Sequence, residues 1–427
     1  MRATRRQRVL VVGAGHSGLL LALALDRLGV RVGVIDPDPV DLTLAAPFGG
    51  RALALMYGAK QVFESLGLWA RLADIAEPVW GVRVEDLSTG AAITYEAAEI
   101  GDHPFGFGIE SRALRRRLLE LVLERPAIEV IAPARLRRLA RTANGIEATF
   151  DDGSRSRAAL VVGADGRGST VRSCAGLDGA SWRYPQTALT FAVSHSQPHN
   201  HRVREYLCPA GPLALLPIGP DLSSITWSER AGLAQHLLEG PRGQLEAALR
   251  ERIGDVLGDF KIVGEPAAYP LAGHRARRFA APRVALVGDA AHGIHPIHAQ
   301  GFNLAVRDIA LLAEVLVEAA RAGRDLGDPE ILMRYDRARR ADADAITAMT
   351  DGLNLLFSND LAPAKLARRL GLGALERLPA LKQLAMRRGM GLSGDVPRLA
   401  RGELLPRLDD LPDPSAVDEA RQGSQLI

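Results

Sequence analysis

The sequence is poor in cysteine and in long apolar runs. Among its 427 residues are two cysteines, Cys174 and Cys208, and neither belongs to a CxxC pair, so a disulfide framework or a cysteine-based metal centre is not expected. The nearest candidate for a membrane span, GLLLALAL at 18–25, ends at Asp26-Arg27, well short of the roughly 20 residues that cross a bilayer. These absences favour a cytoplasmic protein, where thiols stay reduced.

An excess of charge of one sign is also lacking. The chain carries 53 Lys and Arg against 50 Asp and Glu, a formal net charge of +3. No basic stripe alternates with aromatic residues, so we expect no nucleic-acid partner. The basic start, MRATRRQR, leads into an apolar strand and a glycine turn rather than a cleavage site, which argues against a signal peptide. What remains is a globular composition with 47% hydrophobic residues.

The most regular stretch is RVLVVGAGHSGLLLALALDRLGVRVGVID at 8–36. It predicts a buried strand over 9–12, a helix over 17–28 and a second strand over 31–35. Three glycines between the first strand and the helix follow the order G-x-G-x-x-G: Gly13, Gly15 and Gly18. Strand, glycines and helix in this order predict a dinucleotide-binding unit.

Each part of this unit has a mechanical reason to bind a dinucleotide. Gly13 permits a tight turn, Gly15 lets the backbone approach a pyrophosphate, and Gly18 lets helix and strand pack closely. The helix begins with free N–H groups and the positive end of its dipole. Asp36, at the end of the second strand, is placed to accept hydrogen bonds from ribose hydroxyls. This stretch alone leaves both FAD and NAD(P) open.

Two later stretches repeat the pattern of a buried strand that ends in glycine and an acid. LVVGADGRGSTVR at 160–172 carries Asp165, and RVALVGDAAH at 283–292 carries Gly288 and Asp289. Open α/β sheets bind ligands at the carboxyl ends of their strands. We therefore expect the three strands to lie in one sheet and their ends to face one crevice.

The rest of the chain predicts a second sheet and a helical C-terminal part. Short segments with period-two alternation within 78–104 and 180–272 predict antiparallel strands, and a helical pattern runs from 303 to 357 with little interruption. Residues 362–388 carry seven basic residues and one acid on a leucine-rich helical pattern. Such a segment suits either an anionic membrane surface or packing on the domain.

The combination of G-x-G-x-x-G, GADG and GD resembles the class A flavoprotein monooxygenases, the family of p-hydroxybenzoate hydroxylase. A closer resemblance, to the ubiquinone-biosynthesis hydroxylases, covers nearly the whole chain. The stretches that carry it are RALALMYGAKQVFESLGLW at 51–69, IESRALRRRLLE at 109–120, HPIHAQGFNLAVRD at 295–308, TDGLNLLFSND at 350–360 and GLSGDVPRLARG at 391–402.

The resemblance implies an α/β fold with a Rossmann-type FAD-binding domain, an interleaved antiparallel β-sheet substrate domain and a C-terminal helical region. It implies FAD as the cofactor and NAD(P)H as a transient reductant; no second G-x-G-x-x-G follows a strand. The implied activity is hydroxylation of a polyprenyl phenol in ubiquinone biosynthesis by O2 through a flavin C4a-hydroperoxide. Peripheral contact with the inner face of the cytoplasmic membrane through 362–388, and a quinone-biosynthesis complex, would suit this lipid substrate.

By the resemblance, the FAD contacts lie in the three motifs, on two arginines and in the loop that precedes the last long helix. They are Gly13, Gly15, Gly18, Asp36, Arg51, Arg112, Asp165, Gly288, Asp289, Pro296, Gly301, Phe302 and Asn303. The helix that starts near Gly301 would aim its positive end at the N1–C2=O edge of the isoalloxazine and stabilise the anionic reduced flavin. We expect Pro296, His298 and Gln300 to form the catalytic site.

Three histidines spaced three apart, His292, His295 and His298, invite a metal site or a hydrolase charge relay. Glycine and proline between them disfavour a regular helix of metal ligands, and no G-x-S-x-G elbow is present. We expect no metal, and we expect His292 and His295 to shape the loop through hydrogen bonds.

One departure from the resemblance keeps two alternatives open. Where the ubiquinone-biosynthesis branch carries Ala-Gly before Gln-Gly, this chain has His298-Ala299, which places a titratable side chain close to the flavin. The alternatives are a hydroxylase of soluble phenols or polyketides, and a flavin-binding accessory protein without turnover. The predicted division of the chain is 1–77, 105–179 and 273–325 for the FAD-binding domain, 78–104 and 180–272 for the substrate sheet, 326–402 for the helical region and 403–427 for a mobile tail.

Overall fold

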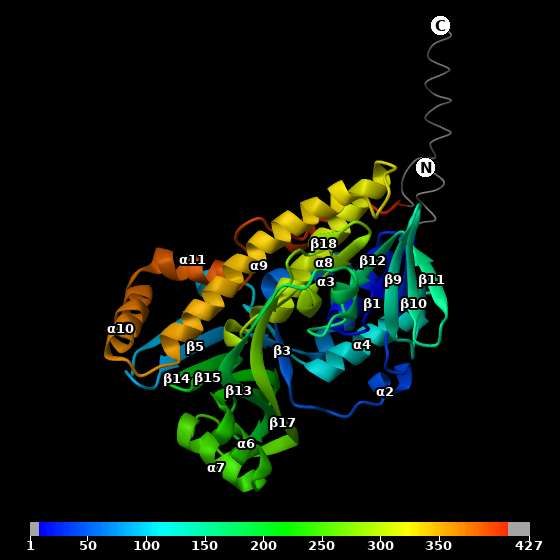
Figure 1. The fold of residues 1–427 in the computed structure, drawn as a ribbon. Coiled ribbons are helices and arrows are strands. Elements are labelled where there is room, and N and C mark those ends of the chain that lie inside the picture. The colour runs from blue at the N-terminus through cyan, green and yellow to red at the C-terminus, as the bar shows by residue number, and fades with distance from the viewer. Residues whose placement is uncertain (1–7, 409–427) are drawn as a thin grey trace, which may run out of the picture.

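The computed structural model describes residues 8–408, and a six-stranded sheet forms one side of them (Figure 1). Its order is β18-β19-β12-β1-β2-β8, and all pairs except β18–β19 are parallel. The strands are β1 (Arg8–Val12), β2 (Arg31–Ile35), β8 (Ile128–Ile131), β12 (Leu160–Gly163), β18 (Ala280–Ala281) and β19 (Val284–Leu286). β12 lies between β1 and β19, so the prediction that the three motif strands share one sheet is confirmed.

Two long helices, α1 (His16–Arg27) and α8 (Gln300–Arg321), follow the first and the third motif and pack against each other. α1 is buried from Gly18 to Leu25, which agrees with the apolar sequence of that stretch. Gly18 is required by close packing, because a Cβ there would lie 1.8 Å from the carbonyl oxygen of Gly13. The predicted helix at 17–28 is therefore present, one residue earlier.

An eight-stranded sheet forms the second body, in the order β20-β17-β13-β16-β15-β14-β5-β6. Its strands are β5 (Gly81–Asp86), β6 (Ala92–Glu96), β13 (Ala180–His195), β14 (Arg202–Cys208), β15 (Gly211–Gly219), β16 (Leu222–Arg230), β17 (Phe260–Arg275) and β20 (His292–Gly293). The expected all-antiparallel pairing is wrong for one pair, since β5 and β14 are parallel. They belong to segments separated by more than a hundred residues, so no hairpin constrains their direction.

Several smaller elements surround the two sheets. A three-stranded sheet joins β3 (Ala52–Met56), β7 (Gly106–Glu110) and β4 (Ala76–Val79), and another joins β11 (Arg155–Ala158), β10 (Gly145–Phe150) and β9 (Leu136–Thr142). The other helices before α8 are α2 (Val40–Leu44), α3 (Tyr57–Ser65), α4 (Ser111–Leu123), α5 (Thr170–Cys174), α6 (Ala231–Glu239) and α7 (Arg242–Ile253). α6 and α7 cover the eight-stranded sheet, where the sequence predicted strands alone.

The C-terminal part contains α9 (Pro329–Phe357), α10 (Ala362–Arg377) and α11 (Pro379–Gly389). The helical pattern expected from 303 to 357 with little interruption is interrupted once, between α8 and α9, where Gly323 adopts a left-handed φ of 70° and the side chain of Asp328 caps the start of α9. Between residues 8 and 408 no helix is long and apolar enough to span a bilayer. Leu405 and Leu408 are buried, so the start of the predicted tail is packed; residues 409–427 lie outside the described part.

Candidate flavin site

The first motif opens a turn between β1 and α1 that leaves room for a ligand. Gly13 adopts a φ of 107°, and a Cβ there would lie 2.4 Å from the carbonyl oxygen of Ala164 in the second motif. A Cβ on Gly15 would meet nothing within 4 Å. Gly15 is also the N-cap of α1 and offers no side-chain hydrogen bond to it. The first N–H groups of α1 therefore remain available to an anion at this turn.

Asp36 lies at the end of β2, as predicted, and is held by the first motif. Its carboxylate accepts hydrogen bonds from the backbone N–H of Ala14 (2.5 Å) and of Asp38 (3.0 Å). Arg115 of α4 reaches the same place, because its Nε donates to the carbonyl oxygen of Ala14 (2.9 Å) and its guanidinium lies 3.8 Å from the Asp36 carboxylate. Sequence reasoning missed Arg115, although it lies one helical turn after Arg112 in SRALRRR.

His16, the first residue of α1, lies where the motifs meet. Its Nε2 donates to the carbonyl oxygen of Ser111 (2.7 Å), and its ring contacts that of Phe302 edge-on, with centroids 5.7 Å apart. Burial lowers the pKa of His16 to about 4, and the nearby charges of Arg51 and Arg115 act in the same direction. The imidazole is therefore neutral at physiological pH. The glycine fingerprint gave no signal for this residue.

The second motif uses its acid to build the turn. The carboxylate of Asp165 accepts hydrogen bonds from the Ser169 hydroxyl (2.5 Å) and from the backbone N–H of Val171 (3.1 Å), at the start of α5. Asp165 thus holds the turn that meets Gly13, and its side chain has partners within its own motif.

The third motif begins the flavin loop, by which we mean residues 288–303. Gly288 has a φ of 57°, and its N–H donates to the buried Asp308 of α8 (2.9 Å). Asp308 also accepts from His292 Nε2 (2.7 Å) and from Arg339 Nε of α9 (2.7 Å). Burial opposes the charge, but His292 and Arg339 hold the pKa of Asp308 below its usual value. A buried ion network therefore fixes the third motif from behind.

Asp289 points the other way, toward solvent. Its side chain is about half exposed and lies 3.3 Å from the Nε of Arg167 in the second motif. Its carbonyl oxygen accepts from His274 Nε2 (2.8 Å). The side chains of Arg167 and Asp289 thus join the second and third motifs by an exposed ion pair, which a ribityl or ribose hydroxyl can replace without leaving a buried charge.

His295 is fully buried and ties the flavin loop to the second sheet. Its Nδ1 accepts from the N–H of Ile297 (3.2 Å), so Nε2 carries the proton and donates to Gln186 of β13 (3.1 Å). Burial lowers the pKa of His295 to about 4. Gln186 in turn donates to Asn354 of α9 (3.1 Å). His292 and His295 shape the loop through hydrogen bonds, as expected, and they do so with partners on different elements.

The strained part of the loop is the departure from the family pattern. His298 and Ala299 both adopt left-handed conformations, with φ of 64° and 50°, and Pro296 precedes them, half-buried. Two consecutive non-glycine residues in this region are uncommon and mark a functional or over-determined turn. The His298 side chain is exposed.

The turn is followed by the start of α8, where the side-chain amides of Asn303 and Gln300 bind other parts of the protein. Asn303 donates to the carbonyl oxygens of Ala54 (2.8 Å) and Ala299 (3.0 Å) and accepts from the N–H of Met56 (2.8 Å). Gln300 donates to the carbonyl oxygen of Gly389 (3.1 Å) at the end of α11. The side chains of Asn303 and Gln300 are therefore hydrogen-bonded within the protein. The groups that this end of α8 presents to a ligand are backbone N–H groups.

Ala299 caps α8 without a side-chain hydrogen bond, and a Cβ on Gly301 would meet nothing within 4 Å. This end of α8 is thus as open as the start of α1.

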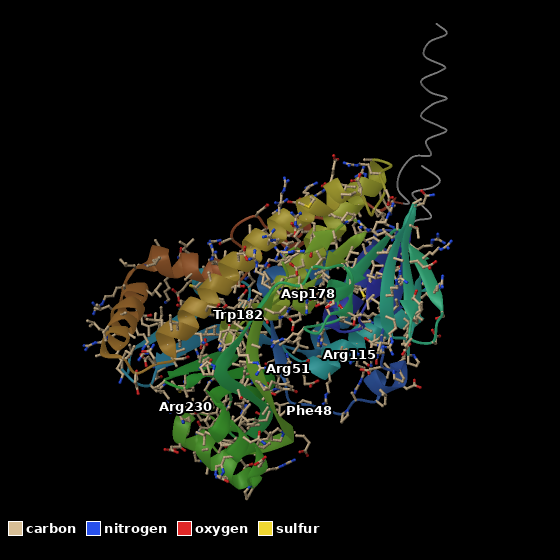
Figure 2. All side chains as sticks on the ribbon, viewed as in Figure 1. Phe48, Arg51, Arg115, Asp178, Trp182 and Arg230 are labelled. Atoms are coloured by element: carbon tan, nitrogen blue, oxygen red, sulfur yellow. The ribbon has the colours of Figure 1, made fainter. Side chains whose placement is uncertain are left out.

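The two arginines predicted to contact FAD have different surroundings. Arg51 is exposed with its guanidinium 5.6 Å from the ring centre of Tyr269, whereas Arg112 donates to the carbonyl oxygen of Pro47 (2.9 Å). Arg51 and Arg115 lie between the two sheets (Figure 2).

Within residues 8–408, the one group of potential metal ligands that lies close together is away from this crevice: Glu77, His199 and His201. Both ring nitrogens of His199 are in use, since Nε2 donates to Gly219 (2.7 Å) and Nδ1 accepts from the N–H of His201 (2.9 Å). His201 pairs with Glu77 (2.8 Å). We assign no metal to it.

The region between the ends of the motif strands and the starts of α1 and α8, which we call the crevice, therefore has the parts that FAD requires. Two helix N-termini without side-chain caps, glycines with open space, an acid at the end of β2 and a guanidinium beside it converge from distant segments. Such an arrangement defines a Rossmann-type flavoprotein.

Comparison with known proteins makes the assignment specific. Residues 6–350 match a family model described as "FAD binding domain", and the chain belongs to this family of FAD-dependent monooxygenases. It is 44% identical to "Ubiquinone hydroxylase UbiL" of Rhodospirillum rubrum over 92% of both chains. It is 31% identical to "3-demethoxyubiquinol 3-hydroxylase" of Escherichia coli, over 90% of this chain and 98% of that one.

A solved structure shares the fold: p-nitrophenol 4-monooxygenase PnpA of Pseudomonas putida, with a TM-score of 0.76 and 20% identity over 91% of this chain and 99% of that one. The protein binds FAD, and NAD(P)H is the reductant typical of its family. The fold class expected from the sequence is confirmed.

Proposed function

We propose that the protein hydroxylates the aromatic ring of a polyprenylated phenol, a precursor of ubiquinone, with NAD(P)H as the reductant and O2 as the oxygen source. The observation that supports this most is the FAD crevice in a chain that matches a ubiquinone hydroxylase over 92% of its length.

FAD, when bound, supplies the redox chemistry and the activation of oxygen. The chain's own residues hold it and exclude water. The N–H groups at the start of α1 and the open Gly15 suit the pyrophosphate, and Asp36 with Arg115 suits the adenosine ribose. The start of α8 presents a positive dipole end, which favours negative charge on a reduced flavin.

The strained turn of the flavin loop supplies the proposed catalytic side of the crevice. We assign Pro296 and the exposed His298 to the wall that faces the substrate ring. Gln300 is a positioning residue, because its amide binds Gly389 rather than the crevice. Asp289 and Arg51 are proposed to contact the flavin when their present partners, Arg167 and Tyr269, give way.

A polyprenylated substrate resides in lipid, so we also propose that the protein works at the inner face of the cytoplasmic membrane. The contact would use residues 362–388, whose basic residues are suited to anionic lipid. A complex with other enzymes of quinone biosynthesis would shorten the path of such a substrate.

The test uses the purified, FAD-loaded protein with a prenylated phenol in detergent micelles, NADH or NADPH, and O2. We expect NAD(P)H oxidation that depends on the phenol and a product heavier by one oxygen atom, measured by mass spectrometry. Deletion of the gene in its host should accumulate the corresponding quinone precursor.

Two results would replace the proposal. Faster turnover of a soluble phenol than of any prenylated one would make it a hydroxylase of soluble substrates. FAD binding without NAD(P)H oxidation in the presence of either class would make it an accessory flavoprotein. His298→Ala provides the matched variant: if His298 faces the substrate, its removal raises KM for the phenol while the FAD content stays constant.

A further inference from the structure

The helices α10 and α11 meet at an angle at the outer edge of the molecule, beyond the end of α9 (Figure 1), and we call this helix–turn–helix segment the hairpin. Exposed leucines gather there. Fifteen large hydrophobic side chains are exposed among residues 8–408, and seven of them lie within 355–384, with between 44% and 76% of their surface exposed. We call them the leucine face: Leu355, Leu361, Leu366, Leu370, Leu378, Leu381 and Leu384. Scattered apolar residues are ordinary on a protein surface, but a cluster marks an interaction site.

On its opposite side, the hairpin is bound to the rest of the protein by ion pairs from two of its seven basic residues, which we call the latches. Arg368, 1% exposed, donates to Asp86 at the end of β5 (2.8 Å) and to the carbonyl oxygens of Leu356 (3.0 Å) and Asn359 (2.9 Å). Lys382 is buried and donates to Glu99 (2.9 Å). These two residues are therefore unavailable to a partner, and the hairpin is held with its leucine face outward.

The remaining charges of the hairpin decide what covers that face. Lys365 is half-buried and paired with Asp360 (2.9 Å), and four further basic residues are exposed: Arg369, Arg377, Arg387 and Arg388. Beside Asp360, the acid on this stretch is Glu376. Leucines among several exposed arginines suit the interface of an anionic bilayer, where apolar side chains enter the acyl boundary and guanidinium groups stay at the phosphates.

We propose that the leucine face and these arginines dock the protein on an anionic bilayer, a refinement that rests on the proposed lipid substrate. The surface extends beyond residues 362–388 to Leu355 and Leu361, and it excludes Arg368 and Lys382. The end of the hairpin is bonded to the flavin loop and to α3, because the carbonyl oxygen of Gly389 accepts from Gln300 and that of Met390 accepts from the N–H of Gly58 (2.9 Å).

The experiment measures sedimentation of the full-length FAD-loaded protein with vesicles, without substrate. One set of vesicles contains phosphatidylglycerol and phosphatidylcholine, and the other phosphatidylcholine alone. We expect tighter binding to the anionic set, weakened by salt, because each basic residue near such a surface strengthens binding about fivefold. The variant Leu366→Ser/Leu370→Ser/Leu381→Ser/Leu384→Ser should bind at least about tenfold more weakly, because its apolar contact is lost.

The matched control is Leu42→Ser/Leu404→Ser, which removes two leucines, each 64% exposed, from elsewhere on the surface; its binding should equal that of the unaltered protein. Retained FAD absorbance verifies folding of each variant. Vesicle binding by the fourfold variant equal to that of the control would overturn the inference. So would a dimer, seen by light scattering, that the fourfold variant abolishes, because a second copy would then cover the face. Hydroxylation of a prenylated phenol in micelles is scored separately, so a failure of the proposed activity is not mistaken for a failure to dock.

Discussion

The flavin loop, which follows β19, and the α10–α11 hairpin, which follows α9, are held in different ways. Behind the flavin loop, Asp308, His292 and Arg339 form a buried ion network, and His295 adds a buried hydrogen bond to β13. The hairpin instead depends on two latches and turns its leucines outward. The buried network fixes the loop in one geometry, whereas the hairpin leaves an apolar surface exposed, which suits contact with a partner.

The largest expected effect comes from removing the centre of the loop network. Asp308→Ala would leave Arg339 and His292 buried without their common acceptor, and we expect about 4 kcal/mol of lost stability. Urea unfolding followed by flavin fluorescence measures it. Asp342→Ala is the control, because it also contacts Arg339 (2.7 Å) but is partly exposed. Equal losses of stability in the two variants would show that the buried network stabilises the protein no more than a partly exposed ion pair does.

Acid should weaken the loop next. His295 has a pKa of about 4 in the folded protein and an ordinary value of 6.5 when unfolded, so the unfolded chain takes up the proton first as pH falls. Its contribution is complete above about pH 6.5 and is lost progressively down to about pH 4, in total about 3 kcal/mol. Unfolding midpoints between pH 7 and pH 4 measure the slope.

The control for this pH dependence is His295→Gln, which keeps a donor toward Gln186 and cannot titrate. It should flatten the curve in part, because His16, whose pKa is also lowered to about 4, still contributes. A slope unchanged by the substitution would mean that His295 is not the group that titrates.

Breaking a hairpin latch should act locally rather than globally. Arg368→Met removes the donor to Asp86 and to the carbonyl oxygens at the end of α9. We expect the free energy of unfolding to fall by about 2 kcal/mol. This loss is below the usual one for a broken buried ion pair, because water can reach the opened edge. Hydrogen exchange of α10 should rise while that of α8 stays unchanged. Loss of FAD from this variant would contradict the separation of the two regions.

The sequence predicted the parts of the site whose chemistry is local. Gly13, Gly15, Gly18 and Asp36 lie where a strand–glycine–helix pattern requires them, because all four belong to one continuous strand–glycine–helix–strand stretch. Arg115 and His16 were missed, since their roles depend on Ala14, Ser111 and Phe302, which only the folded chain brings together.

The same limit applies to the basic hairpin and to the sheets. Seven bases on a helical pattern look alike in the sequence, but Arg368 and Lys382 face Asp86 and Glu99, which lie almost three hundred residues earlier. The parallel pairing of β5 with β14 is likewise set by packing between distant segments. The three strand endings are the exception. Each carries its own glycine and acid, and this local pattern predicted that distant strands lie in one sheet.

The smallest effect should come from the left-handed turn of the flavin loop. Ala299 has a φ of 50°, a conformation that costs a non-glycine residue about 1 kcal/mol. Ala299→Gly relieves this strain but gives the unfolded chain more freedom, so we expect a net change in stability within about 0.5 kcal/mol. If the left-handed turn is needed to aim the start of α8, the released turn should bind FAD several-fold more weakly at unchanged stability. Apoprotein titration with FAD measures this, and Ala322→Gly, at the other end of α8, is the control. Equal FAD affinity in both variants would mean that Asn303 and Gln300 position the helix without help from the turn.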